Sequence, residues 1–177
     1  QDNIADGINL AIKNKVDIIT MSLGSKYAMP KIKKAIESAF NNNILVFCAA
    51  GNSGINQDIM YPARDPNTIS IGAIDENFNR TEFTCSGEEL DFLSPGYNIM
   101  SIIPNGRYAL MSGTSMSNPF AVGCAALYLS YYRQQKNQKY IGQQEMINIL
   151  KNNSINLSNP MLREKRYQGY GIIKPVL

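Results

Sequence analysis

The feature of this sequence that most constrains its fold is an alternation, in its first half, of helical segments with short apolar runs. Apolar residues recur at helical spacing in residues 3–15 and 30–42, and β-branched or apolar runs follow at 17–21 and 44–50. Strands that are apolar on both faces are typical of parallel sheets covered by helices on either side. The sequence therefore predicts an α/β fold with a doubly wound, mostly parallel sheet.

The second half of the chain changes character after one more continuous apolar run at 69–74, which predicts a further buried strand. Glycine and proline then divide the sequence into short segments. We expect short strands at 82–84, 90–93 and 99–103, followed by helices at 119–133 and 143–151. No repeat or linker interrupts the chain, so residues 1–177 are expected to belong to one domain.

Composition argues against several classes of partner. The net charge is only +3 and the lysines are scattered, which predicts no nucleic-acid partner. No apolar run approaches the roughly 18 residues of a membrane span, and no signal segment precedes the first helix. Three cysteines stand at wide spacing, without a metal motif or a disulfide framework. Cys48 and Cys124 are expected to be buried, whereas for Cys85 a reactive thiol is the alternative to burial.

One serine is placed as a nucleophile would be. Residues 113–117 (Gly-Thr-Ser-Met-Ser) combine a small, permissive turn with the start of a predicted helix. Such a turn exposes the hydroxyl of Ser115, and the helix N-terminus favours negative charge beside it. The alternative is a serine that only caps the helix. The chain contains no histidine, so it does not itself supply the base that a nucleophilic serine normally needs.

Four motifs occur in a definite order along the chain. They are 19–24 (Ile-Thr-Met-Ser-Leu-Gly), 49–54 (Ala-Ala-Gly-Asn-Ser-Gly), 90–96 (Leu-Asp-Phe-Leu-Ser-Pro-Gly) and 113–117. Their order and intervals resemble those of the subtilisin-like serine proteases over essentially the whole sequence. The resemblance implies a subtilisin-like fold and a serine endopeptidase. It also implies that residues 1–177 are the C-terminal part of one subtilisin-like catalytic domain.

The resemblance also shows what these residues do not include. The family places its catalytic aspartate and histidine before the Ser-Leu-Gly strand, and this chain begins just before that strand. We therefore expect both residues, and the first strands of the sheet, to come from another polypeptide, either a separate chain or a fragment released by autoprocessing. An inhibitory pro-segment is a further partner that the resemblance implies. Phe120 departs from the family, which usually has a structural histidine at that position.

The resemblance implies a role for two polar residues. Ser115 would attack the peptide carbonyl and form an acyl-enzyme, and Asn52 would donate a hydrogen bond to the resulting oxyanion. The alternative for Asn52 is a turn residue, because asparagine tolerates unusual dihedral angles. A second function stays open, that of a catalytically inactive pseudoprotease acting as a binding or regulatory module. The presence of both Ser115 and Asn52 counts against it.

A further set of residues is predicted to bind a peptide or protein substrate. Ser22 and Leu23 would pair with an extended substrate by strand addition, while glycines let a substrate backbone come close. Met60 precedes a segment that shapes the main specificity pocket in this family, so its thioether would fill the pocket and modify its preference. The predicted substrate-binding residues are Ser22, Leu23, Gly24, Ala50, Gly51 and Met60.

No cofactor is needed for the predicted chemistry. In relatives, the loop corresponding to Ala63, Asp65 and Thr68 binds a structural Ca²⁺ or Na⁺ through backbone carbonyls, which are suitable hard ligands. An ordinary turn is the alternative here. Because members of the family are mostly secreted, the resemblance implies an extracellular or cell-surface location. The free cysteines and the missing signal leave an intracellular enzyme open.

Overall fold

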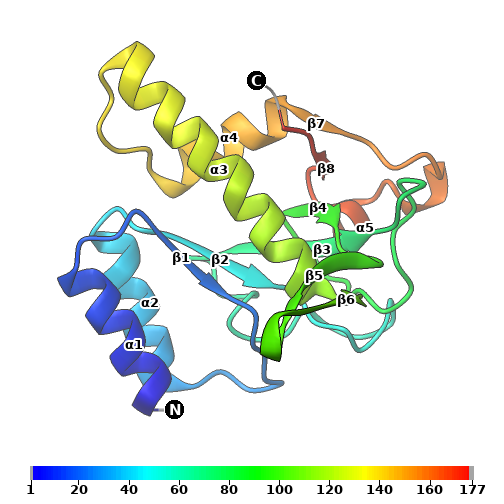
Figure 1. Ribbon diagram of the computed structural model, residues 1–177, viewed down its shortest axis with the longest axis horizontal. Helices are drawn as coiled ribbons and strands as arrows, with labels where there is room; N and C mark the ends of the chain where they lie inside the picture. The colour runs from blue at the N-terminus through cyan, green and yellow to red at the C-terminus, as the bar shows by residue number, and fades with distance from the viewer. Residues whose placement is uncertain (1, 176–177) are drawn as a thin grey trace.

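The computed structural model describes residues 2–175 and arranges them around a six-stranded sheet (Figure 1). The strand order is β1-β2-β3-β4-β8-β7, with parallel pairing from β1 to β8 and antiparallel pairing between β8 and β7. This confirms the predicted doubly wound, mostly parallel α/β sheet. The strands are β1 (Ile18–Met21), β2 (Leu45–Ala49), β3 (Ile69–Ile74), β4 (Phe92–Pro95), β7 (Ser154–Ile155) and β8 (Ile172–Ile173).

Helices cover both faces of the sheet. The alternating side chains of β2 show how: Val46 and Cys48 join the core under α1 and α2, while Leu45 and Phe47 join the core under α3 and α4. All five residues of β2 are buried, as expected for a strand inside a parallel sheet. The helices are α1 (Asp2–Lys13), α2 (Pro30–Asn41), α3 (Thr114–Lys136), α4 (Gln143–Asn152) and α5 (Lys165–Gln168), with 3₁₀ turns at Pro104–Gly106 and Pro160–Leu162.

The first strand lies at an edge of the sheet. We predicted a buried strand at 17–21, but only Met21 of β1 is buried and Thr20 is exposed. Within the described residues, β1 has one sheet neighbour, β2, so its other edge is open. The predicted strand is confirmed, but its predicted burial was wrong, because the apolar run does not reveal how many neighbours a strand has.

The strand predicted at 82–84 is a turn instead. The buried guanidinium of Arg80 donates to the carbonyls of Thr84 and Cys85 at 2.8 and 2.9 Å, and to that of Tyr167 at 2.8 Å. Carbonyls held by a guanidinium are not available to a strand partner, which explains the error. Burial lowers the pKa of Arg80 to about 10, below its ordinary value.

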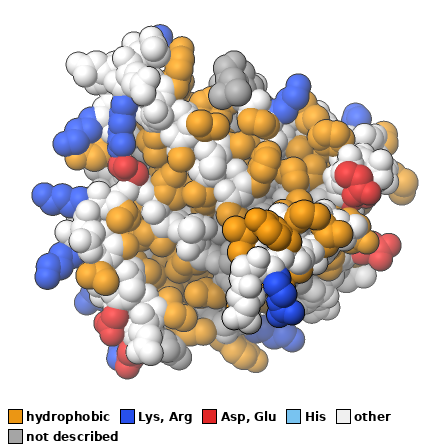
Figure 2. Space-filling model, viewed as in Figure 1, with side chains coloured by type: hydrophobic (Ala, Val, Ile, Leu, Met, Phe, Trp, Pro, Cys, Tyr) orange, Lys and Arg blue, Asp and Glu red, His pale blue; other side chains and the backbone are white. Residues whose placement is uncertain are grey.

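A separate antiparallel hairpin leads into α3. It consists of β5 (Ile99–Ile103), which was predicted, and β6 (Arg107–Met111), which was not. Cross-strand pairing places four apolar side chains on one face, and they are 59–70% exposed. Figure 2 shows hydrophobic side chains gathered over this hairpin. The four residues are Met100, Ile102, Tyr108 and Leu110.

The helix that follows the hairpin begins at Thr114 rather than at the predicted residue 119. Pro119 therefore lies inside the helix, where it has no N–H to donate to the carbonyl of Ser115. The Ser22 hydroxyl donates to that carbonyl instead, at 3.3 Å. Deeper in the helix, the buried hydroxyl of Ser117 contacts the Ser94 hydroxyl at 2.7 Å and fixes the helix start against β4. The result is that Ser115 lies in the first helical turn.

Candidate active site

A cleft of about 220 Å³ lies where the end of β1, the loop after β2 and the start of α3 meet. It brings together residues that are far apart in the sequence, and among them are seven of the eight predicted catalytic and substrate-binding residues. Ala50 is the exception, because it is fully buried beneath the cleft. The lining residues are Ser22, Leu23, Gly24, Ala49, Gly51, Asn52, Ser53, Met60, Thr114 and Ser115.

Ser115 occupies the N-terminal turn of α3, a helix of 23 residues. Amide groups in the first turn have no acceptor within the helix, and the helix dipole makes this end positive. Both properties favour a developing negative charge close to the serine. Among residues 2–175, no side chain accepts a hydrogen bond from the Ser115 hydroxyl. The local geometry therefore suits a nucleophile, while the described residues provide no base for it.

The amide of Asn52 is oriented by Thr114. Its Oδ1 accepts hydrogen bonds from the Thr114 backbone N–H at 2.9 Å and from the Thr114 hydroxyl at 2.8 Å. Since Oδ1 is engaged, Nδ2 must point the other way. That nitrogen lies 3.1 Å from where a Cβ at Gly113 would stand, so a side chain at position 113 would crowd it. Asn52 thus presents a fixed donor beside the start of α3.

The loop that carries Asn52 (residues 51–54) is held from behind by a neighbouring segment. The Gly51 carbonyl accepts the Cys85 N–H at 3.1 Å, and the Gly54 N–H donates to the Phe83 carbonyl at 2.8 Å. The Cys85 thiol sulfur accepts the Ser53 N–H at 3.4 Å. Cys85 is fully buried, so the reactive-thiol alternative was wrong, whereas the predicted burial of Cys48 and Cys124 is confirmed.

The predicted substrate strand is exposed and held extended. Ser22, Leu23 and Gly24 follow β1 and are all solvent-accessible. Immediately beyond them, Ser25 pairs with Tyr61 through two backbone hydrogen bonds of 2.8 Å. This bridge fixes the direction of the exposed segment, whose backbone can then accept an added strand.

The loop predicted as a cation site is organised around a hydroxyl. Thr68 Oγ1 lies 3.1, 3.2 and 2.8 Å from the carbonyl oxygens of Pro62, Ala63 and Asp65. The buried Asp65 carboxylate accepts the Tyr61 hydroxyl at 3.1 Å, and burial near this carboxylate raises the pKa of Tyr61. Among residues 2–175 there is no cluster of three or more His, Cys, Asp or Glu side chains suited to a metal. The three carbonyls thus point toward the Thr68 hydroxyl, which donates its one hydrogen among them.

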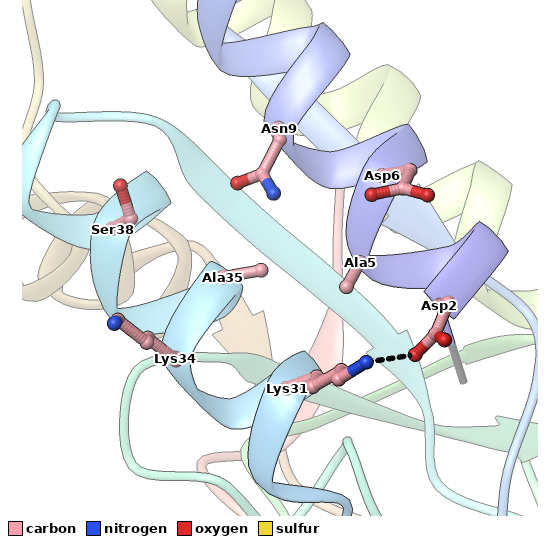
Figure 3. A pocket seen from close by; sticks show the side chains of 8 residues that line it. All are labelled: Asp2, Ala5, Asp6, Asn9, Lys31, Lys34, Ala35 and Ser38. Atoms are coloured by element: carbon pink, nitrogen blue, oxygen red, sulfur yellow. Dashed lines mark hydrogen bonds and ion pairs between the residues drawn. The ribbon is translucent and has the colours of Figure 1, made fainter.

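A separate hollow of about 360 Å³ lies between α1 and α2 (Figure 3). Lys31 Nζ and Asp2 Oδ1 form an ion pair of 2.7 Å there, with side chains 65% and 66% exposed. Exposed pairs of this kind contribute little to stability or binding. None of the predicted site residues lines this hollow, so the chemistry is concentrated in the smaller cleft. The hollow is lined by Asp2, Ala5, Asp6, Asn9, Lys31, Lys34, Ala35 and Ser38.

Sequence reasoning missed four residues of the site: Thr114, Cys85, Ala49 and Ser53. Thr114 lies inside the Gly-Thr-Ser motif, and a hydroxyl next to the predicted nucleophile was the available signal. Ala49 adjoins the predicted Ala50 and faces the cleft, because consecutive strand residues point to opposite sides. For Cys85 no local signal exists, since its contact with Ser53 is formed across 32 residues.

No helix within residues 2–175 is long and apolar enough to cross a membrane.

Proteins with similar sequences are named as proteases. The chain is 39% identical over 140 residues to the major intracellular serine protease of Bacillus subtilis (strain 168). This alignment covers 77% of this chain and 44% of that protein. It is 42% identical over 130 residues to subtilisin E of the same strain, covering 72% and 34%. The chain thus spans less than half the length of either relative, and their names leave its compartment open.

Solved protease structures also have a similar fold. The structure of the prenylagaramide maturation protease aligns with a TM-score of 0.86 and 28% identity, covering 97% of this chain and 64% of that one. The model of the subtilase family matches residues 1–171, which include every residue of the cleft. The geometry at Ser115 and Asn52 and these matches agree, and the chain belongs to the subtilase family of subtilisin-like serine proteases.

Proposed function

We propose that this chain supplies the nucleophile and the oxyanion donors of a serine endopeptidase, as the C-terminal part of one subtilisin-like catalytic domain. The triad aspartate and histidine would come from a companion segment, meaning a polypeptide outside these 177 residues. Membership of the subtilase family supports the reaction class. The observation that carries the proposal is the orientation of Asn52 by Thr114, the residue that directly precedes Ser115.

In the proposed reaction, Ser115 Oγ attacks the carbonyl carbon of a peptide bond while its proton passes to the companion histidine. The carbonyl oxygen becomes an oxyanion and accepts hydrogen bonds from Asn52 Nδ2 and the Ser115 backbone N–H. The C–N bond then breaks, and the leaving amine takes the proton from the histidine. Water, deprotonated by the same histidine, hydrolyses the acyl-enzyme and regenerates the serine. The exposed segment at Ser22, Leu23 and Gly24 would hold the substrate as an added strand.

The absence of histidine from the sequence fixes what these residues can do alone. In subtilisin, removal of the triad histidine costs about 10⁶ in turnover. That factor corresponds to about 8 kcal/mol of activation free energy. The chain by itself should therefore be almost inert, and activity should need the companion segment.

The open edge of β1 and its surroundings suit such a companion. A groove of about 500 Å³ runs between β1 and α3 and combines apolar side chains with polar ends. An unpaired strand edge beside an apolar groove favours the addition of another strand and a covering element. The lengths of the relatives agree with a large missing portion, since this chain spans 44% and 34% of two of them. The groove is lined by Asp17, Ile18, Val122, Ala126, Leu129, Ser130, Arg133 and Gln134.

Labelling with a fluorophosphonate probe, read by intact-mass spectrometry, tests the proposal. The probe reacts with an activated serine and not with an ordinary one. We expect Ser115 to be labelled when the companion segment is present, and we expect no labelling of a Ser115→Ala variant or of the isolated chain. Absence of labelling from an assembly free of pro-segment would contradict the proposal and favour the pseudoprotease. Labelling that appears only after removal of a bound pro-segment would support an inhibited protease.

A further inference from the structure

The side chain of Met60 lies between two glycines that form facing walls of the cleft. Its Sδ is 2.9 Å from where a Cβ at Gly24 would stand and 3.1 Å from the same position on Gly51. Its Cγ is 2.8 Å from the Gly51 position. Because a Cβ never approaches other atoms so closely, the thioether occupies the space that the two missing side chains leave. The slot between the glycines is therefore filled by this chain's own side chain.

The backbone around Met60 is anchored on both sides. The Met60 N–H donates to the Ala50 carbonyl at 2.9 Å, and the Met60 carbonyl accepts the Arg64 N–H at 3.2 Å. The floor behind the slot is closed as well, because the fully buried Cys85 has its sulfur 3.0 Å from the Gly51 Cβ position. The thioether is thus held between the two glycines of the cleft, and Met60 also lines a neighbouring hollow of about 250 Å³.

The position of this slot relative to Ser115 and Asn52 determines which part of a substrate it meets. Because Ser115, Asn52 and Gly51 line one cleft, the residue whose carbonyl lies against Ser115 and Asn52 in the proposed reaction would place its side chain in the space beside Gly51. The whole cleft measures about 220 Å³, less than the roughly 300–1,000 Å³ of pockets that enclose a ligand. Little of that volume is left for a substrate side chain once Met60 is in place.

We propose that Met60 makes this protease selective for peptides with a small residue, glycine, alanine or serine, immediately before the scissile bond. The inference rests on the proposed endopeptidase function and specifies its substrate class. A large apolar or aromatic side chain at that position would have to displace the thioether from between Gly24 and Gly51. Such a displacement would lose its contacts with both walls, which disfavours the larger substrate.

The test compares kcat/KM for four peptides that differ only in the residue before the cleaved bond: alanine, serine, leucine and phenylalanine. The enzyme is the assembled protease, meaning this chain with its companion segment. We expect wild type to cleave the alanine peptide about 100-fold better than the phenylalanine peptide, because one methylene in a tight pocket changes selectivity about 10- to 200-fold. Met60→Gly should raise the phenylalanine-to-alanine ratio about tenfold or more.

Two further variants keep the test decisive. Met60→Leu retains the bulk and should keep the wild-type preference, while Met60→Ala should shift the ratio in the same direction as Met60→Gly. Equal cleavage of phenylalanine and alanine peptides by wild type would overturn this inference and leave the endopeptidase function standing. Failure to cleave any of the peptides, together with no fluorophosphonate labelling of Ser115, would instead overturn the proposed function and this inference with it.

Discussion

The hydroxyl of Thr114 stands between two parts of the candidate active site. It donates to Asn52 Oδ1 at 2.8 Å and accepts the Gly51 N–H at 3.2 Å. One hydroxyl thus orients both the side chain of Asn52 and the backbone of the loop that carries it. Thr114 directly precedes Ser115, so the residue that holds Asn52 is bonded to the proposed nucleophile. This fixes the position of Asn52 relative to Ser115.

Replacing Thr114 by valine should slow catalysis by about tenfold in kcat, because the valine side chain has a similar shape but neither donates to Asn52 nor accepts from Gly51, and only the backbone N–H of residue 114 still holds Asn52. Turnover of the assembled protease on a single peptide measures this. Thr114→Ser retains the hydroxyl and should keep most of the activity. Asn52→Ala should lower turnover further, by about 10²–10³-fold, the range measured for such a donor in subtilisin. Full activity of both Thr114→Val and Asn52→Ala would exclude this pair from catalysis.

Arg80 should make a large contribution to stability. Its buried guanidinium donates to four backbone carbonyls and to the Ser86 hydroxyl, so Arg80→Met leaves several buried acceptors without a donor. We expect the free energy of unfolding to fall by about 2–4 kcal/mol, measured by urea denaturation. The matched control is Arg107→Met on the exposed hairpin, which should change stability by less than about 0.5 kcal/mol. Equal effects of both substitutions would contradict the assignment.

The buried carboxyl group of Asp91 should make the free energy of unfolding depend on pH. Burial raises its pKa above the ordinary 3.8, although the Ser70 N–H at 2.9 Å and the Lys165 charge oppose that shift. The folded state then binds a proton at Asp91 more tightly than the unfolded state does. Its stabilising contribution is therefore present below the ordinary pKa and is lost as pH rises through the raised pKa.

The variant Asp91→Asn isolates this effect, because it keeps an oxygen acceptor for Ser70 but does not titrate. The unfolding free energy of wild type minus that of Asp91→Asn should fall as pH increases from about 3.5 to 7, and then level off. Urea denaturation at a series of pH values measures the difference. A difference that grows over this range would mean that attraction to Lys165, whose Nζ is 4.0 Å from the carboxylate, outweighs burial.

Thr68 should replace a structural cation. Because its hydroxyl lies among the carbonyls of Pro62, Ala63 and Asp65, neither added CaCl₂ nor EDTA should move the thermal unfolding midpoint of wild type. Thr68→Val removes the donor and should cost about 1–3 kcal/mol of stability. A midpoint of wild type that rises with calcium concentration would show that the loop binds the cation after all.

The groove between β1 and α3 should be the docking surface for the companion segment. Ala126 lines this groove and is exposed, so Ala126→Arg should weaken association by about tenfold or more through the bulk and charge it introduces. Leu127 is 50% exposed on the same helix but does not line the groove, which makes Leu127→Arg the matched control. Titration of labelled companion against each variant measures the affinities. Equal affinities for both variants would place the interface elsewhere.

Comparison of sequence and structure shows where local patterns suffice. The strand predicted at 69–74 coincides with β3, and the helix predicted at 30–42 agrees with α2 to within one residue, because burial on both faces or on one helical stripe is encoded by nearby residues. Two predictions were wrong for a shared reason: the burial of the strand at 17–21, and the strand at 82–84, which is a turn. The number of sheet neighbours of β1 and the hydrogen bond from Arg80 to the Tyr167 carbonyl depend on contacts that no local window contains.

The sequence by itself determined the alternation of helices and strands in the first half of the chain, the α/β class, and the presence of Ser115 and Asn52 in a subtilisin-like order of motifs. Only the tertiary structure decided how these residues are used. Thr114 contacts Asn52 across 62 residues of sequence, and Met60 comes to lie between Gly24 and Gly51. Such contacts depend on the register of neighbouring strands and on which rotamer fits the space that remains. Periodicity and motif spacing record neither of these.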